Sequence, residues 1–171
     1  MIVLGIDVGL AITGWAVLDV LKPGKIAVMD YGYLETKSTR PLQDRLNYIY
    51  IKLKEIIVKY NPQKIGIEEL YFHATGSGLP RYSKSIIATS QSRGLIFLLA
   101  AQHNIHINEY NAKTIKLTAT GYGNAEKQQV QFTIKHILQL KELPKPDDVS
   151  DALAIAYVTG IDNDSIFRRN N

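Results

Sequence analysis

The chain has 171 residues, of which 46% are hydrophobic and 21% charged, with a formal net charge of +4. This balance predicts one globular domain over residues 1–160 and a flexible C-terminal tail over residues 161–171. The absence of cysteine excludes disulfides, thiolate metal sites and cysteine nucleophiles, and no apolar run is long enough to span a bilayer. With no signal-peptide pattern, a cytoplasmic location is expected. The mild basicity permits a nucleic-acid partner without requiring one.

The first part of the chain predicts an antiparallel meander. Residues 2–7 and 12–19 read as two strands joined by a tight turn that contains Gly9, and residues 25–35 read as a third strand. Short links between consecutive strands favour antiparallel pairing, because a parallel connection needs a crossover.

Helices and strands alternate in the remainder. Apolar residues recur every three or four positions from Leu42 and predict a helix that ends at Asn61-Pro62. The later predicted elements are a strand at 64–70, a helix at 83–103, a strand at 105–110, a short helix capped by Asn111 or Thr114, a helix from near Ala125 and a last helix at about 147–160. The predicted fold is α/β, with a mixed five-stranded sheet (three antiparallel strands, then parallel additions) flanked by helices.

Acidic residues stand at the ends of two predicted strands and on the last helix. Asp7 closes an apolar strand, and Glu68, with Glu69 beside it, closes another. Asp148 and Asp151 lie three residues apart on one helix face. If the two strands are neighbours, Asp7 and Glu68 emerge at one sheet edge, and the last helix can bring its pair over them. Buried carboxylates that cluster in this way either raise their pKa values or bind cations.

Each acid also has an ordinary structural interpretation. Asp7 suits a tight turn, Glu68 a solvated strand end and Asp148 a helix N-terminus. Asp151, beside a strongly apolar helical stretch, is the hardest to explain in this way. Together the four acids favour a site for hard cations such as Mg²⁺ or Mn²⁺, two of which, about 3.5–4 Å apart, would support phosphodiester cleavage.

Four sequence motifs occur in a characteristic order: GIDVG…TGWAVLD, IGIEELYF, TGYGNAEKQQV and DDVSDALAIA. Their order and spacing resemble the RuvC family of Holliday-junction resolvases, over nearly the whole chain from Ile2 to about Gly160. The resemblance implies a ribonuclease-H-like fold and a homodimeric endonuclease that nicks four-way DNA junctions symmetrically, in recombination and repair. It also implies two Mg²⁺ ions per active site, with Mn²⁺ able to substitute, and it leaves open whether a branch-migration motor is a further partner.

The resemblance also assigns roles to individual residues. The implied metal-binding acids are Asp7, Glu68, Asp148 and Asp151. Asp147 can exchange roles with Asp148, because it lies four residues before Asp151. Lys116 and Lys127 match two basic positions that would hold the scissile or an adjacent phosphate. Without the resemblance, both would be read as solvated lysines.

The segment 73–85, HATGSGLPRYSKS, is longer than the resemblance predicts. Its composition indicates a mobile loop whose basic and aromatic groups contact DNA near the junction centre, and a linker without contacts is the alternative. Tyr71, or Phe72 in its place, matches an aromatic residue that would stack on a base. The predicted DNA contacts are Tyr71, Phe72, Arg81, Tyr82, Lys84, Arg93, Lys113, Lys116 and Lys127.

The predicted helix at 83–103 is apolar over too much of its surface for a lone solvated helix. This pattern predicts a dimer face, and burial in the protein's own core is the alternative. The residues predicted for this face are Ile86, Ile87, Leu95 and Leu99.

Two other functions fit parts of the sequence. A non-catalytic module that binds branched DNA would rely on the basic loop, but every acid of the nuclease is present. The D-x-G motif followed by T-G also resembles the phosphate loop of actin-like and sugar-kinase ATPases, which close a cleft between two such domains. A chain of 171 residues makes only one of them, so the nuclease is the favoured prediction.

Overall fold

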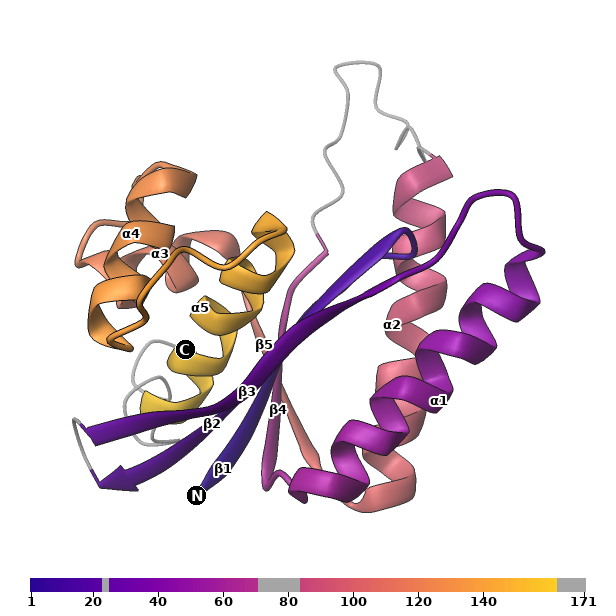
Figure 1. Ribbon diagram of the computed structural model, residues 1–171, viewed down its shortest axis with the longest axis horizontal. Helices are drawn as coiled ribbons and strands as arrows, with labels where there is room; N and C mark the ends of the chain where they lie inside the picture. The colour runs from indigo at the N-terminus through magenta and orange to yellow at the C-terminus, as the bar shows by residue number, and fades with distance from the viewer. Residues whose placement is uncertain (23–24, 71–83, 163–171) are drawn as a thin grey trace, which may run out of the picture.

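The computed structural model describes residues 1–22, 25–70 and 84–162 (Figure 1). In chain order the described elements are β1 (Ile2–Asp7), β2 (Ile12–Lys22), β3 (Lys25–Glu35), α1 (Leu42–Tyr60), β4 (Lys64–Glu68), α2 (Lys84–His103), β5 (His106–Tyr110), α3 (Ala112–Thr120), α4 (Lys127–Ile137) and α5 (Asp147–Ile161). These elements are the predicted ones, with differences of a few residues at their ends. None of the helices in the described ranges has the length and hydropathy needed to cross a membrane.

The five strands form one mixed sheet in the order β3-β2-β1-β4-β5. β1 pairs antiparallel with β2, and β2 antiparallel with β3. β4 pairs parallel with β1, and β5 parallel with β4. The predicted meander with parallel additions is therefore confirmed, and β1 and β4, whose last residues are acidic, are direct neighbours.

Helices cover both faces of the sheet. In Figure 1, α1 and α2 lie on one side, while α5 lies on the other with α3 and α4 packed around it. Alternation along β1 divides its side chains between two cores. Leu4 and Ile6 join the core beneath α1 and α2, and Val3 joins the core around α5. By the same alternation, Asp7 belongs to the α5 face.

Helix α5 approaches the sheet so closely that side chains are excluded at one position of β1. A Cβ atom added at Gly5 would lie 2.3 Å from the backbone nitrogen of Ala156 and 2.4 Å from the backbone oxygen of Ala152. Both obstacles are backbone atoms of α5, so any side chain at this position must push the helix away. Gly5 therefore sets the distance between α5 and the strand that carries Asp7.

Gly5→Ala is expected to lower the free energy of unfolding by about 1–3 kcal/mol or more, because the added methyl group overpacks the contact between β1 and α5. Gly32→Ala is the matched control: its Cβ would meet the side chain of Trp15 at 3.0 Å, and a ring can shift more easily than helix backbone. Urea denaturation of both variants measures the difference, and equal losses would contradict this account of Gly5.

Candidate metal and phosphate site

Asp7 and Glu68 emerge at the same edge of the sheet. The parallel register of β1 and β4 pairs Ile6 with Ile67, so the acids that follow these residues leave neighbouring strands side by side. Asp7 is also opposite Gly14 in the antiparallel pair with β2. The first two acids thus lie together for the reason predicted from sequence, namely the adjacency of their strands.

The first turn of α5 rests on this edge. A Cβ at Gly14 would lie 2.0 Å from the backbone oxygen of Asp148, so only glycine lets the helix sit directly on β2 there. The helix begins at Asp147, immediately after Pro146. Its first turns therefore bring Asp148 and Asp151 over the ends of β1 and β4.

The pKa of Asp7 reports how closely these acids are gathered. Burial raises the pKa of Asp7 from 3.8 to about 7, and the negative charges of Asp151, Asp148 and Glu68 add to that effect, while Lys127 opposes it. Burial also raises the pKa of Glu68 and of Asp151, again with contributions from neighbouring acids. The four predicted acids therefore form one interacting group rather than four independent surface charges.

Lys127 supplies positive charge inside this group. Its Nζ lies 2.7 Å from a carboxylate oxygen of Asp151 and 3.7 Å from one of Asp147. Burial alone would lower the pKa of Lys127, but the hydrogen bond and charge of Asp151, together with Asp147 and Asp7, raise it overall. The lysine is the first residue of α4, whose N-terminus is held by reciprocal bonds between Glu126 and Gln129.

A cavity of about 180 Å³ opens beside the acids. Glu68, Asp151, Lys116 of α3 and Lys127 of α4 line this cavity. The remaining residues that line the cavity are apolar. Lys116 and Lys127 both lower the pKa of Glu68, against the effect of burial. The cavity thus combines carboxylates that can take a cation with ammonium groups that can take an anion. Such a pairing suits a metal-bound phosphate.

The donor set fits hard divalent cations, because it consists of carboxylate oxygens. Within the described ranges, however, no three acidic or histidine side chains are gathered as they would be around an ion. Lys127 bonds directly to Asp151, one of the candidate ligands. Metal binding would therefore require these side chains to close on the ion, with Asp151 shared between the ion and Lys127.

Arg93 lies elsewhere than predicted. Its side chain is buried, and its guanidinium donates to the backbone oxygen of Glu68 and to the carboxylate of Glu109. The prediction that Arg93 contacts DNA is therefore corrected: the residue holds the end of β4, and with it Glu68, against β5. Its partner Glu109 was missed, because the pairing depends on a strand neighbour that the sequence pattern does not reveal.

The other predicted residues divide between surface and core. Lys84 and Lys113 are exposed, which leaves their DNA contact a prediction. On α2, Ile87 is 49% exposed, and Ile86 and Leu95 are half-buried. Leu99 is fully buried in the core beneath α1 and α2, so for this residue the core alternative holds and the dimer-face prediction is wrong. The predictions for Tyr71, Phe72, Arg81 and Tyr82 lie outside the described residues.

The free energy of unfolding is expected to depend on pH through Asp7. Its carboxyl ionises near 3.8 in the unfolded chain and at about 7 in the folded protein, so the folded state binds more protons between these values. Stability contributed by the neutral form is therefore lost as the pH rises through this range. Asp7→Asn should stabilise the protein more at about pH 8 than at about pH 4, by an amount on the order of 4 kcal/mol at most.

Urea denaturation in the presence of a metal chelator measures this difference at the two pH values. Glu142→Gln, at an exposed loop position, is the control and should show no such dependence. If Asp7→Asn changed the free energy of unfolding equally at both pH values, Asp7 would not be neutral in the folded protein at the lower pH, and this account would be contradicted.

Comparison with known proteins identifies relatives over almost the full chain. The family model described as "Crossover junction endodeoxyribonuclease RuvC" matches residues 3–159. A protein of that name from Endomicrobium trichonymphae is 46% identical over 156 residues, which cover 91% of this chain and 78% of the relative. Another, from Caldicellulosiruptor saccharolyticus, is 40% identical over 166 residues, covering 97% of this chain and 96% of the relative.

Solved structures match as well. The Thermus thermophilus RuvC structure superposes with a TM-score of 0.83 at 26% identity, covering 94% of each chain. The T. thermophilus RuvC in complex with Holliday junction substrate gives 0.82 at 26% identity, covering 92% of each chain. The mixed sheet and its helices are thus the ribonuclease-H-like arrangement of these proteins. The chain belongs to the RuvC family of crossover junction endodeoxyribonucleases.

Proposed function

We propose that this chain resolves four-way DNA junctions by metal-dependent hydrolysis of phosphodiester bonds, with paired nicks that leave 5′-phosphate ends. The observation that carries the proposal is the interacting group of four acids around Asp7, with two lysines beside it. A relative of matching fold was solved with a Holliday junction substrate, which supports this class of DNA as the substrate. The protein would act in the cytoplasm on DNA undergoing recombination or repair, where a branch-migration motor would be a partner.

The four acids would hold two Mg²⁺ ions, for which Mn²⁺ could substitute. When bound, such ions activate a water molecule for attack and stabilise the departing 3′ oxygen. Asp7 is the residue whose pKa responds to all three other acids, so its carboxylate would be a central member of the set that holds the ions. Asp147 takes part less directly, through its 3.7 Å contact with Lys127.

Lys116 and Lys127 would hold the phosphate. Both line the cavity beside Glu68 and Asp151, where an incoming phosphate would bring its non-bridging oxygens. Their ammonium groups would counter the charge that builds on these oxygens during hydrolysis. Because Lys127 already bonds to Asp151, its ammonium is held in place before the DNA arrives.

Asp7→Asn is expected to reduce cleavage of a labelled synthetic four-way junction in Mg²⁺ by on the order of 10³-fold or more, because it removes a central charge of the metal site. Junction binding should persist. Glu142→Gln, which replaces an acid with its amide at an exposed position, should cleave normally.

The assay separates the competing functions. Binding without cleavage by the wild-type protein, in either Mg²⁺ or Mn²⁺, would favour a non-catalytic branched-DNA-binding module. ATP hydrolysis without DNA would instead favour the phosphate-loop interpretation of Asp7. Paired nicks that disappear with Asp7→Asn would support the nuclease.

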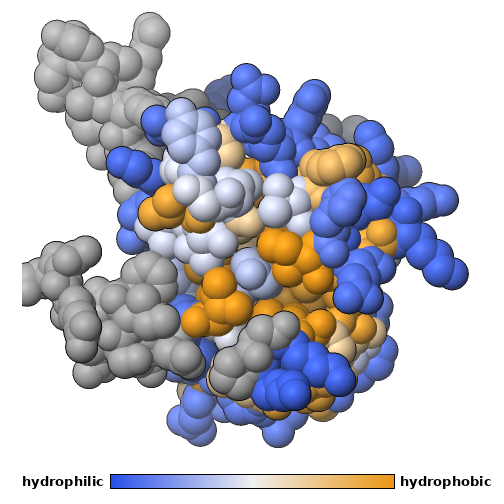
Figure 2. All heavy atoms as spheres, turned by 90° about the vertical axis from the view of Figure 1, so that its left-hand side faces the viewer, coloured by the Kyte–Doolittle hydropathy of each residue, from blue (hydrophilic) through white to orange (hydrophobic). Residues whose placement is uncertain are grey.

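We further propose that the protein acts as a homodimer, so that its two-fold axis matches that of the junction. On α2, Ile87, Phe97 and Leu98 are 49%, 41% and 49% exposed, so this helix presents three large apolar side chains to solvent. A second apolar surface competes for this role. Figure 2 shows apolar side chains gathered in the middle of the face that carries α4, and a groove there is lined by Ile26, Val28, Ile137, Leu140, Tyr157 and Ile161.

Ile87→Glu is expected to convert the dimer to a monomer in sedimentation, because a charge on α2 would have to be buried on association. The same variant should lose the pairing of nicks, so that single nicks accumulate. Ile137→Glu, in the groove beside α4, is the matched variant and should remain dimeric. The reverse result would place the dimer contact in the groove, and a monomeric wild-type protein would contradict the dimer proposal.

A further inference from the structure

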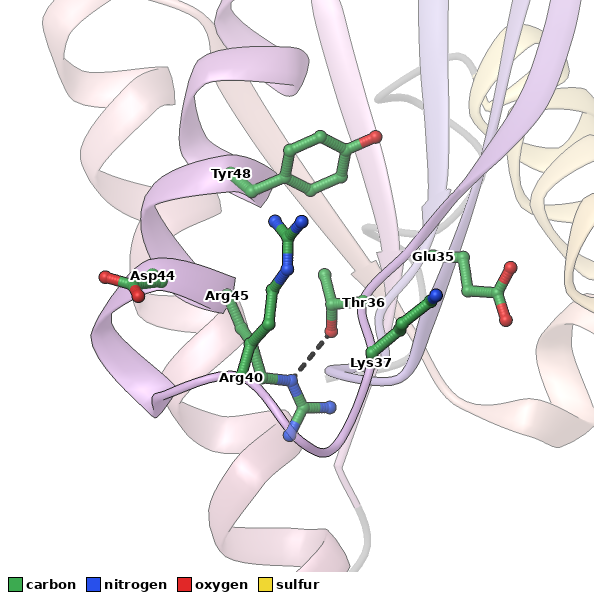
Figure 3. Close-up of a pocket in the computed structure, with 7 residues that line it drawn as sticks. All are labelled: Glu35, Thr36, Lys37, Arg40, Asp44, Arg45 and Tyr48. Atoms are coloured by element: carbon green, nitrogen blue, oxygen red, sulfur yellow. Dashed lines mark hydrogen bonds between the residues drawn. The ribbon is translucent and has the colours of Figure 1, made fainter.

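A second cavity lies at the same end of the sheet as the acids. It has a volume of about 190 Å³ and is formed where β3 ends and α1 begins (Figure 3). Because the end of β3 pairs with the beginning of β2, this cavity shares the sheet edge from which Asp7 emerges. Its lining residues are Glu35, Thr36, Lys37, Arg40, Asp44, Arg45 and Tyr48, which we call the Arg40 pocket.

The Arg40 pocket is tied to the turn that follows Asp7. Arg45 donates from Nε to the hydroxyl of Thr36 over 2.8 Å, and that hydroxyl donates to the backbone oxygen of Leu10. The backbone nitrogen of Thr36 also donates to the backbone oxygen of Ala11 over 2.9 Å. Thr36 is buried, so these bonds hold one wall of the pocket in a fixed position relative to the β1–β2 turn.

The charge of the pocket is positive where a ligand would enter. Lys37 and Arg40 are exposed, and neither forms an ion pair with any residue in the described ranges. In Figure 3 the guanidinium of Arg40 points toward Tyr48, whereas the carboxylates of Glu35 and Asp44 point away from the other side chains. The two acids thus leave the positive groups uncompensated within the pocket.

These groups match the chemistry of a phosphate. A guanidinium presents paired N–H donors to anionic oxygens, a lysine ammonium adds a mobile charge, and the hydroxyl of a tyrosine can donate as well. Arg45 is half-buried and oriented by its bond to Thr36, so part of the donor set is held in place before a ligand binds. In protein–DNA complexes, more than half of the hydrogen bonds go to the phosphates and sugars of the DNA backbone, and these bonds fix how the DNA lies on the protein.

We propose that the Arg40 pocket binds a backbone phosphate of the junction at a distance from the bond that is cut. This inference rests on the proposed function. The acids lie on the α5 face of the sheet edge, and the pocket lies where α1 begins, on the other face. DNA bound at both places passes over the edge of the sheet. The pocket then fixes the direction of one arm while another phosphate lies at Asp7.

The test measures junction binding in Ca²⁺ over a range of salt concentrations, with wild type beside the double variant Lys37→Ala/Arg40→Ala. One lost phosphate contact should reduce the slope of log affinity against log salt by about 0.9, which weakens binding about tenfold near 0.1 M salt. The control is Lys22→Ala/Lys54→Ala, which removes the same charge at exposed positions away from this edge. An equal effect in the control would overturn the proposal, since it would reflect net charge alone.

Titration with inorganic phosphate examines the pocket without DNA. The amide resonances of Thr36 and Lys37 should shift in a saturable manner in the wild type, and not in Lys37→Ala/Arg40→Ala. If phosphate shifted the Thr36 resonance in the double variant as much as in the wild type, the anion would bind elsewhere and the proposal would be overturned. Phosphate binding combined with an unchanged DNA salt slope would also overturn it, because the pocket would then take a free anion instead of DNA.

The proposed function can fail separately from this inference. If the wild type cleaves junctions and the double variant keeps the wild-type affinity and salt slope, the pocket inference is wrong and the nuclease stands. If the wild type cleaves no junction but binds it with a salt slope that depends on Lys37 and Arg40, the nuclease is wrong and the phosphate site stands.

Discussion

The mutual repulsion of buried carboxylates is the constraint on which the rest of this structure depends. The charged form of Asp7 is disfavoured because its carboxylate is buried away from water and lies beside three other acids. Both effects raise its pKa, to about 7. The fold must therefore hold β1, β4 and α5 together against an electrostatic force that separates them. The contact between α5 and the sheet provides this. Gly5 and Gly14 remove the side chains that would keep the helix away, and the apolar residues of α5 are buried in the core.

Internal cations lessen the same repulsion. Lys127 bonds to Asp151 and lies near Asp147, so one ammonium offsets part of the negative charge of the first turns of α5. Arg93 acts differently, because it bonds to the backbone oxygen of Glu68 and not to its carboxylate. It fixes the position of Glu68 without neutralising it. The negative charge that remains is thus placed where a cation can bind. Arg93 leaves the carboxylate of Glu68 available to that cation, whereas Lys127 would share the carboxylate of Asp151 with it.

Local sequence predicted the strand ends well, and it predicted side-chain partners poorly. Asp7 and Glu68 could be found because an acid that closes an apolar strand is visible in the sequence, and the order of strands made their adjacency plausible. Arg93 and Leu99 could not be assigned, because α2 is apolar over most of its length and its buried side is decided by packing on the sheet. Arg93 can be buried because its guanidinium donates to the carboxylate of Glu109 and to the backbone oxygen at the end of β4. The Arg40 pocket could not be predicted for a related reason. Three basic residues within nine positions are typical of a solvated surface, and the bond from Arg45 to Thr36 depends on the tertiary structure.

The alternation of a β-strand explains how one sheet edge serves two kinds of binding. Neighbouring residues of a strand point to opposite faces, so the edge that directs Asp7 toward α5 directs Ile6 toward α1 and α2. The connection from β3 to α1 must pass over that second face, and its first residue, Thr36, is held by Leu10 and Ala11, in the turn that follows Asp7. Any shift of this turn would therefore move Asp7 and the wall of the Arg40 pocket formed by Thr36 together. A fixed spacing between the proposed cation site and the proposed phosphate site would suit an extended, regularly charged backbone, and it would follow from strand pairing rather than from a dedicated domain.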